Sequence, residues 1–102
     1  MLSFENQNIE FKQEYVPDIL KEVIGFANAD GGTVFVGVRK DGAVLGIDDP
    51  DGVMLQIANT LKDSLSPDVM PFVKVNTVEI EGKQVVKIDV TTGIYRPYYI
   101  RE

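Results

Sequence analysis

The chain has 102 residues, of which 44% are apolar and 25% charged, and it contains no cysteine and no histidine. This length suits one domain, while the missing residue types exclude disulfide and thiolate chemistry and any use of imidazole as a base, nucleophile or metal ligand. With ten basic against sixteen acidic residues the net charge is −6, so a nucleic-acid role requires a local basic patch.

The first half of the chain predicts a strand, a helix and a hairpin. Residues 7–12 alternate between polar and apolar side chains, so Glu10 and Lys12 share one face of an expected strand. Apolar residues at helical spacing predict a helix over residues 17–29, which the glycine pair at 31–32 terminates. The β-branched and aromatic run at 33–38, followed by Lys40-Asp41-Gly42 and residues 43–45, predicts a tight hairpin.

The second half predicts another helix and another hairpin. Asp49 is a suitable N-cap before Pro50, and apolar residues recur every fourth position, which predicts a helix over residues 50–64. Residues 72–80 and 84–90 flank Glu81-Gly82 and predict a long hairpin. A further strand is expected to begin at Tyr98. Because the chain stops at Arg101-Glu102 without a polar tail, we expect a domain cut from a longer protein.

Together these elements predict an α+β domain in which two helices pack on a mainly antiparallel or mixed sheet. The order is β-α-β-β-α-β-β, with a final strand if the segment beginning at Tyr98 pairs. One domain is expected over residues 1–102. No apolar run approaches the roughly 18 residues of a membrane span, and the first residues do not form a secretory signal. A cytoplasmic protein without a membrane partner is therefore expected.

Seven short motifs carry a resemblance to a known family, in which they occur in the same order and at similar spacing. They are Glu10-Phe11-Lys12, G-F-A-N-A-D-G-G at 25–32, Val36-Gly37-Val38, Asp41-Gly42, Leu45-Gly46-Ile47, Ser66-Pro67 and Arg96-Pro97-Tyr98-Tyr99. Along nearly its whole length the chain resembles the Schlafen AlbA_2 domain family. The resemblance implies a DNA-binding domain of the kind found at the N-terminus of bacterial transcriptional regulators.

The family also carries the label divergent AAA or helicase-related, which would imply ATP binding. A phosphate-binding loop requires G-x-x-x-x-G-K-[ST], and the sequence contains no such segment. Gly31 and Gly32 precede a strand rather than open a helix, so a helix dipole is missing there. We interpret Asn28, Gly31 and Gly32 as a structural turn, with a part in a polar surface as the alternative. ATPase or helicase activity is not predicted, and no cofactor is expected.

An enzymatic alternative follows from the same resemblance. Schlafen members that cut structured RNA are similar to this chain at three acidic positions, which makes Glu5, Glu10 and Asp48 candidate catalytic residues and ligands for Mg²⁺ or Mn²⁺. Converging carboxylates can hold such ions and stabilise charge on a phosphate. Against this, Glu10 and Lys12 can form an ordinary exposed ion pair, and Asp48 belongs to an acidic cluster suited to helix capping. A metal-dependent endoribonuclease is therefore the alternative.

The main prediction is nucleic-acid binding, with DNA rather than RNA as the partner. Seven cations are considered, of which Lys12, Arg39, Lys40 and Arg96 are the predicted contacts, beside Lys62, Lys74 and Arg101. Arg39 and Lys40 occupy a hairpin tip that can reach phosphates, although a solvated turn explains them equally well. Tyr95, Tyr98 and Tyr99 can stack on bases, but aromatic residues in a terminal strand commonly belong to a core or an interface.

The third alternative is a dimerisation module without nucleic acid. The long strand expected over residues 72–80 can pair with another chain if it lies at the edge of the sheet. A homo-oligomer would also combine basic clusters from separate copies.

Overall fold

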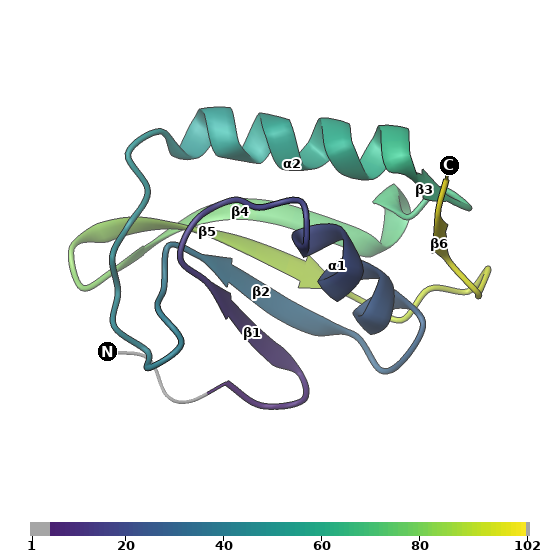
Figure 1. Ribbon diagram of the computed structural model, residues 1–102, viewed down its shortest axis with the longest axis horizontal. Coiled ribbons are helices and arrows are strands. Elements are labelled where there is room, and N and C mark those ends of the chain that lie inside the picture. The colour runs from purple at the N-terminus through teal and green to yellow at the C-terminus, as the bar shows by residue number, and fades with distance from the viewer. Residues whose placement is uncertain (1–4, 102) are drawn as a thin grey trace.

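The computed structural model describes residues 5–101, which form one mixed sheet, two helices and a small second sheet (Figure 1). The strand order of the main sheet is β1-β2-β5-β4, with β1 parallel to β2 and the other pairs antiparallel. The α+β class and the mixed sheet are confirmed. The elements in chain order are β1 Ile9–Lys12, α1 Ile19–Ala27, β2 Gly32–Val36, α2 Pro50–Ser64, β3 Leu65–Ser66, the 3₁₀ turn η1 Met70–Phe72, β4 Val73–Ile80, β5 Lys83–Val90 and β6 Tyr99–Ile100.

The helices follow the sequence signals closely. The second helix has the predicted bounds, because Asp49 Oδ1 accepts a hydrogen bond from Gly52 N at 3.1 Å and Pro50 occupies the first turn. The first helix is shorter than predicted. Residues 17–18 form a turn ahead of it and residues 28–30 a turn after it, and its N-cap, Asp18, makes no side-chain capping bond.

The first hairpin closes at its predicted turn, but its return arm is short. Arg39 N donates to Ala43 O at 2.9 Å, and Val38 pairs with Val44 in an isolated bridge. Beyond that bridge Leu45 N and Gly46 N both donate to Gly37 O, and Ile47 N then donates to Gln84 O of β5 at 2.8 Å. The arm is therefore a bridge rather than a strand.

Apolar side chains cover both faces of the sheet. On one face, both helices share a core with the inward side chains of β2 and β5, including Val34, Val36 and Ile88. On the other face a smaller cluster gathers Phe11, Val38, Val44 and Val85. β1, α1 and β2 form a parallel crossover unit, in which α1 connects the two strands along the chain. Both strands therefore end beside the segment at 37–49.

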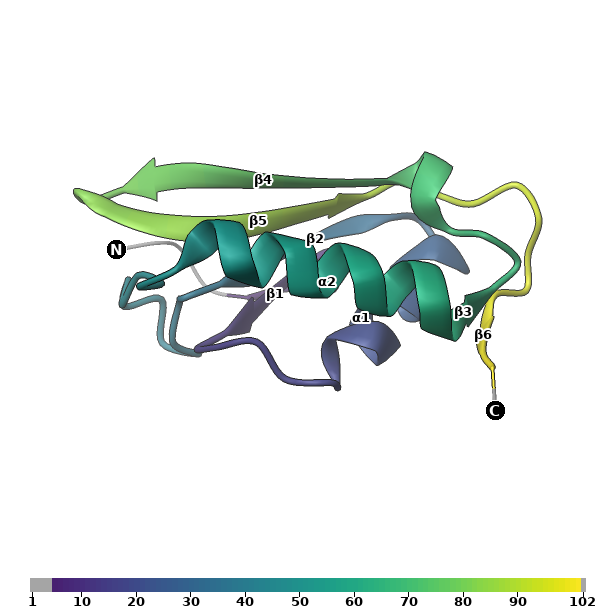
Figure 2. The same cartoon turned by 90° about the horizontal axis from the view of Figure 1, so that it is seen from above.

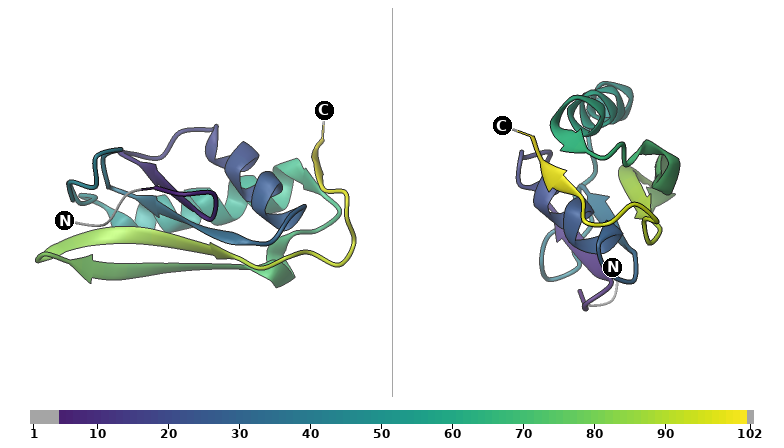
Figure 3. Two further views of the ribbon diagram at one scale, coloured as in Figure 1. Left: turned by 90° about the horizontal axis from the view of Figure 1, so that it is seen from below. Right: turned by 90° about the vertical axis from the view of Figure 1, so that its right-hand side faces the viewer.

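Two ends of the molecule carry the candidate residues. The turn end comprises the C-terminal ends of β1 and β2 and residues 37–49. The β6 end comprises the last turn of α2, the start of β4 and residues 91–101. Figures 1 and 2 show these two groups at opposite ends of the long axis, and the right-hand view of Figure 3 looks onto the β6 end. Within residues 5–101, no helix is long and apolar enough to cross a membrane.

Two glycines give a matched pair of stability predictions. A Cβ at Gly32 would lie 2.5 Å from the Phe26 ring, whereas a Cβ at Gly25, inside α1, would meet nothing within 4 Å. We expect Gly32→Ala to lower the free energy of unfolding by about 1–3 kcal/mol through overpacking. Gly25→Ala should raise it by about 0.5–1 kcal/mol through helix propensity. Urea unfolding measures both, and a Gly32→Ala variant as stable as the wild type contradicts the packing.

Candidate nucleic-acid interface

At the turn end, lysine and glutamate side chains neutralise one another. The Lys40 ammonium donates to Glu5 Oε2 at 3.0 Å and also bonds Glu10. Lys12 Nζ lies 3.9 Å from Glu10 Oε2 and 3.6 Å from Glu22 Oε1. The turn reaches these residues because Gly37 N and Val38 N both donate to the Lys12 carbonyl. Three carboxylates therefore surround two ammonium groups, and the cluster is not a basic patch.

A backbone hydrogen bond from Phe11 also holds Glu5 in this cluster. Partial burial would raise the pKa of Glu5, but the hydrogen bonds from Phe11 N at 2.7 Å and from the Lys40 ammonium outweigh it. The pKa of Glu5 consequently lies below its usual value. The pKa of its partner Lys40 is raised despite partial burial, because both glutamates stabilise the ammonium charge.

The neighbouring cation of the turn is also paired. Arg39 Nε donates to Asp41 Oδ1 at 3.2 Å, and a second guanidinium nitrogen bonds the other carboxylate oxygen. The Arg39 bond, followed by that from Ala43 N, lowers the pKa of Asp41 to about 2. Of the predicted contacts, Lys12, Arg39 and Lys40 thus lie together at the turn end, each with a carboxylate partner.

The three acidic candidates are only partly brought together. Glu5 and Glu10 converge, but on the Lys40 ammonium rather than around a space for a metal ion. Asp48 is exposed and lines a hollow of about 440 Å³ whose other acidic residues are Glu14 and Asp49. Over residues 5–101, no three acidic side chains are grouped so that they could hold a metal. Glu5 and Glu10 thus meet at Lys40, while Asp48 belongs to a separate hollow.

The fourth predicted contact, Arg96, lies at the β6 end. In the described part of the chain its side chain has no hydrogen bond or ion pair, and the same holds for Lys62 on the last turn of α2 and Lys74 at the start of β4. The other seven cations all have partners: Lys12, Lys21, Arg39, Lys40, Lys83, Lys87 and Arg101. All three unpaired cations therefore belong to one end of the molecule.

The three tyrosines of the β6 end divide into one structural and two surface residues. Tyr98 is 2% exposed, and its hydroxyl accepts a hydrogen bond from Tyr95 N at 3.1 Å. Tyr95 and Tyr99 are 62% and 56% exposed. The Tyr95 ring meets Phe72 edge-on, with centroids 6.4 Å apart. Sequence alone did not separate these roles.

The turn after α1 holds the β6 end in place. Asn28 Oδ1 accepts from Tyr98 N at 2.7 Å, and Asn28 Nδ2 donates to Tyr98 O at 3.0 Å. Gly31 follows in a left-handed conformation with φ +82°, which glycine adopts without strain. The sequence indicated a structural turn at Asn28 but not this partner, which is 70 residues away in the sequence.

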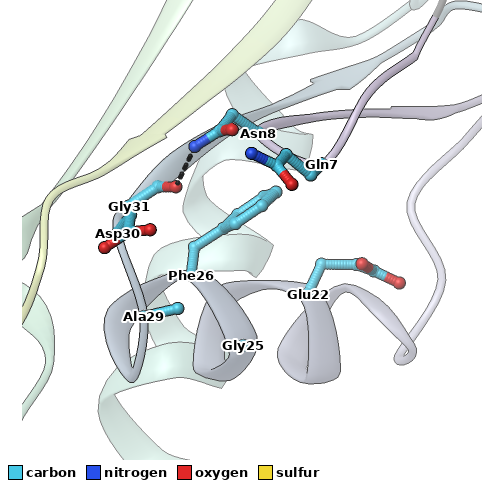
Figure 4. Close-up of a pocket in the computed structure, with 8 residues that line it drawn as sticks. All are labelled: Gln7, Asn8, Glu22, Gly25, Phe26, Ala29, Asp30 and Gly31. Carbon is cyan, nitrogen blue, oxygen red and sulfur yellow. Dashed lines mark hydrogen bonds between the residues drawn. The ribbon is translucent and has the colours of Figure 1, made fainter.

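A hollow of about 320 Å³ lies beside the same turn (Figure 4). The Phe26 ring forms part of its lining, and Asn8 Nδ2 donates to Gly31 O at 3.3 Å. Its charged lining residues are Glu22 and Asp30, with no lysine or arginine among them. The charged side chains of its lining are therefore acidic rather than basic.

The fold is that of a small α+β domain with a mixed sheet, and its β6 end carries exposed tyrosines and the cations that are unpaired within residues 5–101. The family model described as Schlafen, AlbA_2 matches residues 5–102. The chain belongs to the Schlafen AlbA_2 family.

Two solved structures are similar to the chain. One is the N-terminal domain of a Nitrosomonas europaea protein whose name relates it to the ATP-dependent DNA helicase RecG, with 21% identity, a TM-score of 0.76, and coverage of 93% of this chain and 69% of that one. The other is the DIP2311 protein of Corynebacterium diphtheriae, with 22% identity, a TM-score of 0.60, and coverage of 85% of this chain and 20% of that one. These likenesses establish the fold. The comparison with curated proteins finds no match.

Proposed function

We propose that the chain is the nucleic-acid-binding domain of a bacterial transcriptional regulator, with DNA rather than RNA as its target, and that it binds through the β6 end. The family and the helicase-related name of the similar Nitrosomonas domain fit a nucleic-acid-related domain. The observation that carries the proposal is the position of Lys62, Lys74 and Arg96, the cations without side-chain partners among residues 5–101.

Pairing decides which cations are available to phosphate. Lys12, Arg39 and Lys40 must give up carboxylate partners before they can contact DNA, and those carboxylates would then repel the backbone. When the unpaired cations bind phosphate, they give up only bound water, and the counterions released from the DNA add favourable entropy. Since the whole chain has a net charge of −6, the affinity should be weak and should depend steeply on salt.

Fluorescence polarisation of labelled DNA tests the proposal. Binding at about 50 mM salt that fades towards about 200 mM supports it, because counterion release weakens with salt. Absence of binding at low salt contradicts it, as does an affinity that salt leaves unchanged.

The second candidate is the metal-dependent endoribonuclease, which one observation favours: the carboxylates of Glu5 and Glu10 meet at a single cation, Lys40. A metal ion would have to replace the ammonium, so Lys40→Ala should expose the pair. On this candidate, Mn²⁺ should raise the melting temperature of Lys40→Ala more than that of the wild type, since ligands stabilise the folded state that binds them. Mn²⁺ should also support cleavage of tRNA, and Glu10→Ala should abolish that cleavage. Equal melting temperatures and uncut tRNA contradict the enzyme.

A further inference from the structure

Exposed apolar side chains concentrate at the β6 end. Of the six large hydrophobic residues that are exposed among residues 5–101, four lie between positions 94 and 100: Ile94, Tyr95, Tyr99 and Ile100. The other two, Leu45 and Leu55, are far from them in the sequence. A cluster of this kind marks a binding surface more often than isolated exposed residues do.

The charge of the same segment is opposite to that of the chain. Residues 91–101 contain two arginines and no acidic residue, whereas the whole chain has a net charge of −6. Arg101 caps α2 by donating to the carbonyls of Lys62 and Asp63. Arg96, between the two exposed tyrosines in the sequence, has no partner among residues 5–101. The segment therefore complements an anionic ligand with flat apolar groups.

The two rings are presented by a fixed backbone. Tyr99 pairs with Ser66 in the small sheet, and its neighbour Tyr98 is buried and bonded to Asn28 through both backbone groups. At the start of the segment, Gly93 N donates to Ala27 O at 2.9 Å. A surface that is already ordered loses little conformational entropy when a ligand binds.

We infer that the β6 end takes single-stranded nucleic acid, with bases stacked on Tyr95 and Tyr99 and a phosphate held by Arg96. This rests on the proposed nucleic-acid function and specifies its ligand. In a duplex the faces of the bases are covered by their neighbours, so a duplex offers these tyrosines no stacking partner. A single strand offers both phosphates and free base faces. Stacking tolerates any base, so sequence preference should be weak.

The test compares a labelled oligothymidine with a duplex of the same length by fluorescence polarisation at low salt. The wild type should bind the oligothymidine more tightly. Tyr95→Ala and Tyr99→Ala should each weaken oligothymidine binding about tenfold and leave duplex binding within about twofold, because phosphate contacts persist. Tyr95→Phe and Tyr99→Phe keep the ring and should bind like the wild type. Leu55→Ala removes an equally exposed apolar side chain from α2 and should have no effect.

Several outcomes overturn the inference. Unchanged oligothymidine affinity in both alanine variants excludes stacking. A Tyr99→Leu variant that binds as tightly as the wild type assigns the surface to apolar docking instead. Dimerisation that Tyr99→Ala abolishes assigns it to a second copy of the chain. If duplex binding depends on Arg96 while the tyrosine variants change nothing, the proposed function stands and this inference fails. If the wild type binds neither nucleic acid, both fail.

Discussion

Asn28→Ala is expected to lower the free energy of unfolding by about 2–4 kcal/mol, because it leaves two backbone groups without partners. The Asn28 amide is bonded to both Tyr98 N and Tyr98 O, and Tyr98 belongs to the core shared by the helices and the sheet. For a domain of this size such a loss lowers the melting temperature by roughly 10–25 °C. Thermal unfolding followed by circular dichroism measures the change.

Two further variants isolate the role of the Asn28 amide. Asn28→Asp keeps the acceptor for Tyr98 N and removes the donor to Tyr98 O, so its stability should fall between those of the wild type and Asn28→Ala. Asn59→Ala changes an exposed asparagine in α2 and should be neutral or slightly stabilising, because alanine is the better helix former. If the melting temperature of Asn28→Ala equals that of the wild type, residues 91–101 are held by other contacts.

Exchange of Lys62, Lys74 and Arg96 for glutamine in one variant is expected to weaken DNA binding on the order of 100-fold at low salt. Each phosphate contact contributes about 0.9 to the slope of log affinity against log salt for a duplex, so removing all three should reduce that slope by between two and three. These cations are unpaired in the described chain, so their replacement breaks no ion pair. The measurement is a polarisation titration at several salt concentrations.

The matched control exchanges Lys12, Arg39 and Lys40 for glutamine. It changes the net charge by the same amount but removes cations that already have carboxylate partners. We expect a loss of only a few fold from this control, through the general repulsion of a more acidic protein. If the control loses more affinity than the first variant, the interface lies at the turn end and the choice of the β6 end is wrong.

The fold was largely predictable because its signals are local. Asp49-Pro50 specifies the start of α2, and Glu81-Gly82 specifies the turn between β4 and β5, in which both residues have positive φ. The return arm of the first hairpin was not predictable in the same way. After Gly46 its backbone bonds Gln84 of β5 through Ile47 N, and that partner comes from a distant part of the sequence. Local propensity does not report such long-range pairing.

The site was less predictable because ion pairing depends on tertiary structure. Lys40 meets Glu5 across 35 positions because the chain reverses between Asn6 and Ile9, which brings the Glu5 carboxylate to Phe11 N in β1. The sequence therefore identified the cations but could not show which of them were neutralised. In the same way, the motif containing Tyr98 and Tyr99 did not show which ring is buried, since burial depends on tertiary packing, and Tyr98 joins the core shared by the helices and the sheet.

The most direct measurement is an NMR titration of ¹⁵N-labelled protein with oligothymidine, in which amide shifts map the surface that binds. We expect the largest shifts on residues 94–101 and on the neighbouring ends of α2 and β4, near Lys62 and Lys74. Largest shifts at Glu10, Arg39 and Lys40 would contradict this expectation, and so would a spectrum that the oligonucleotide leaves unchanged.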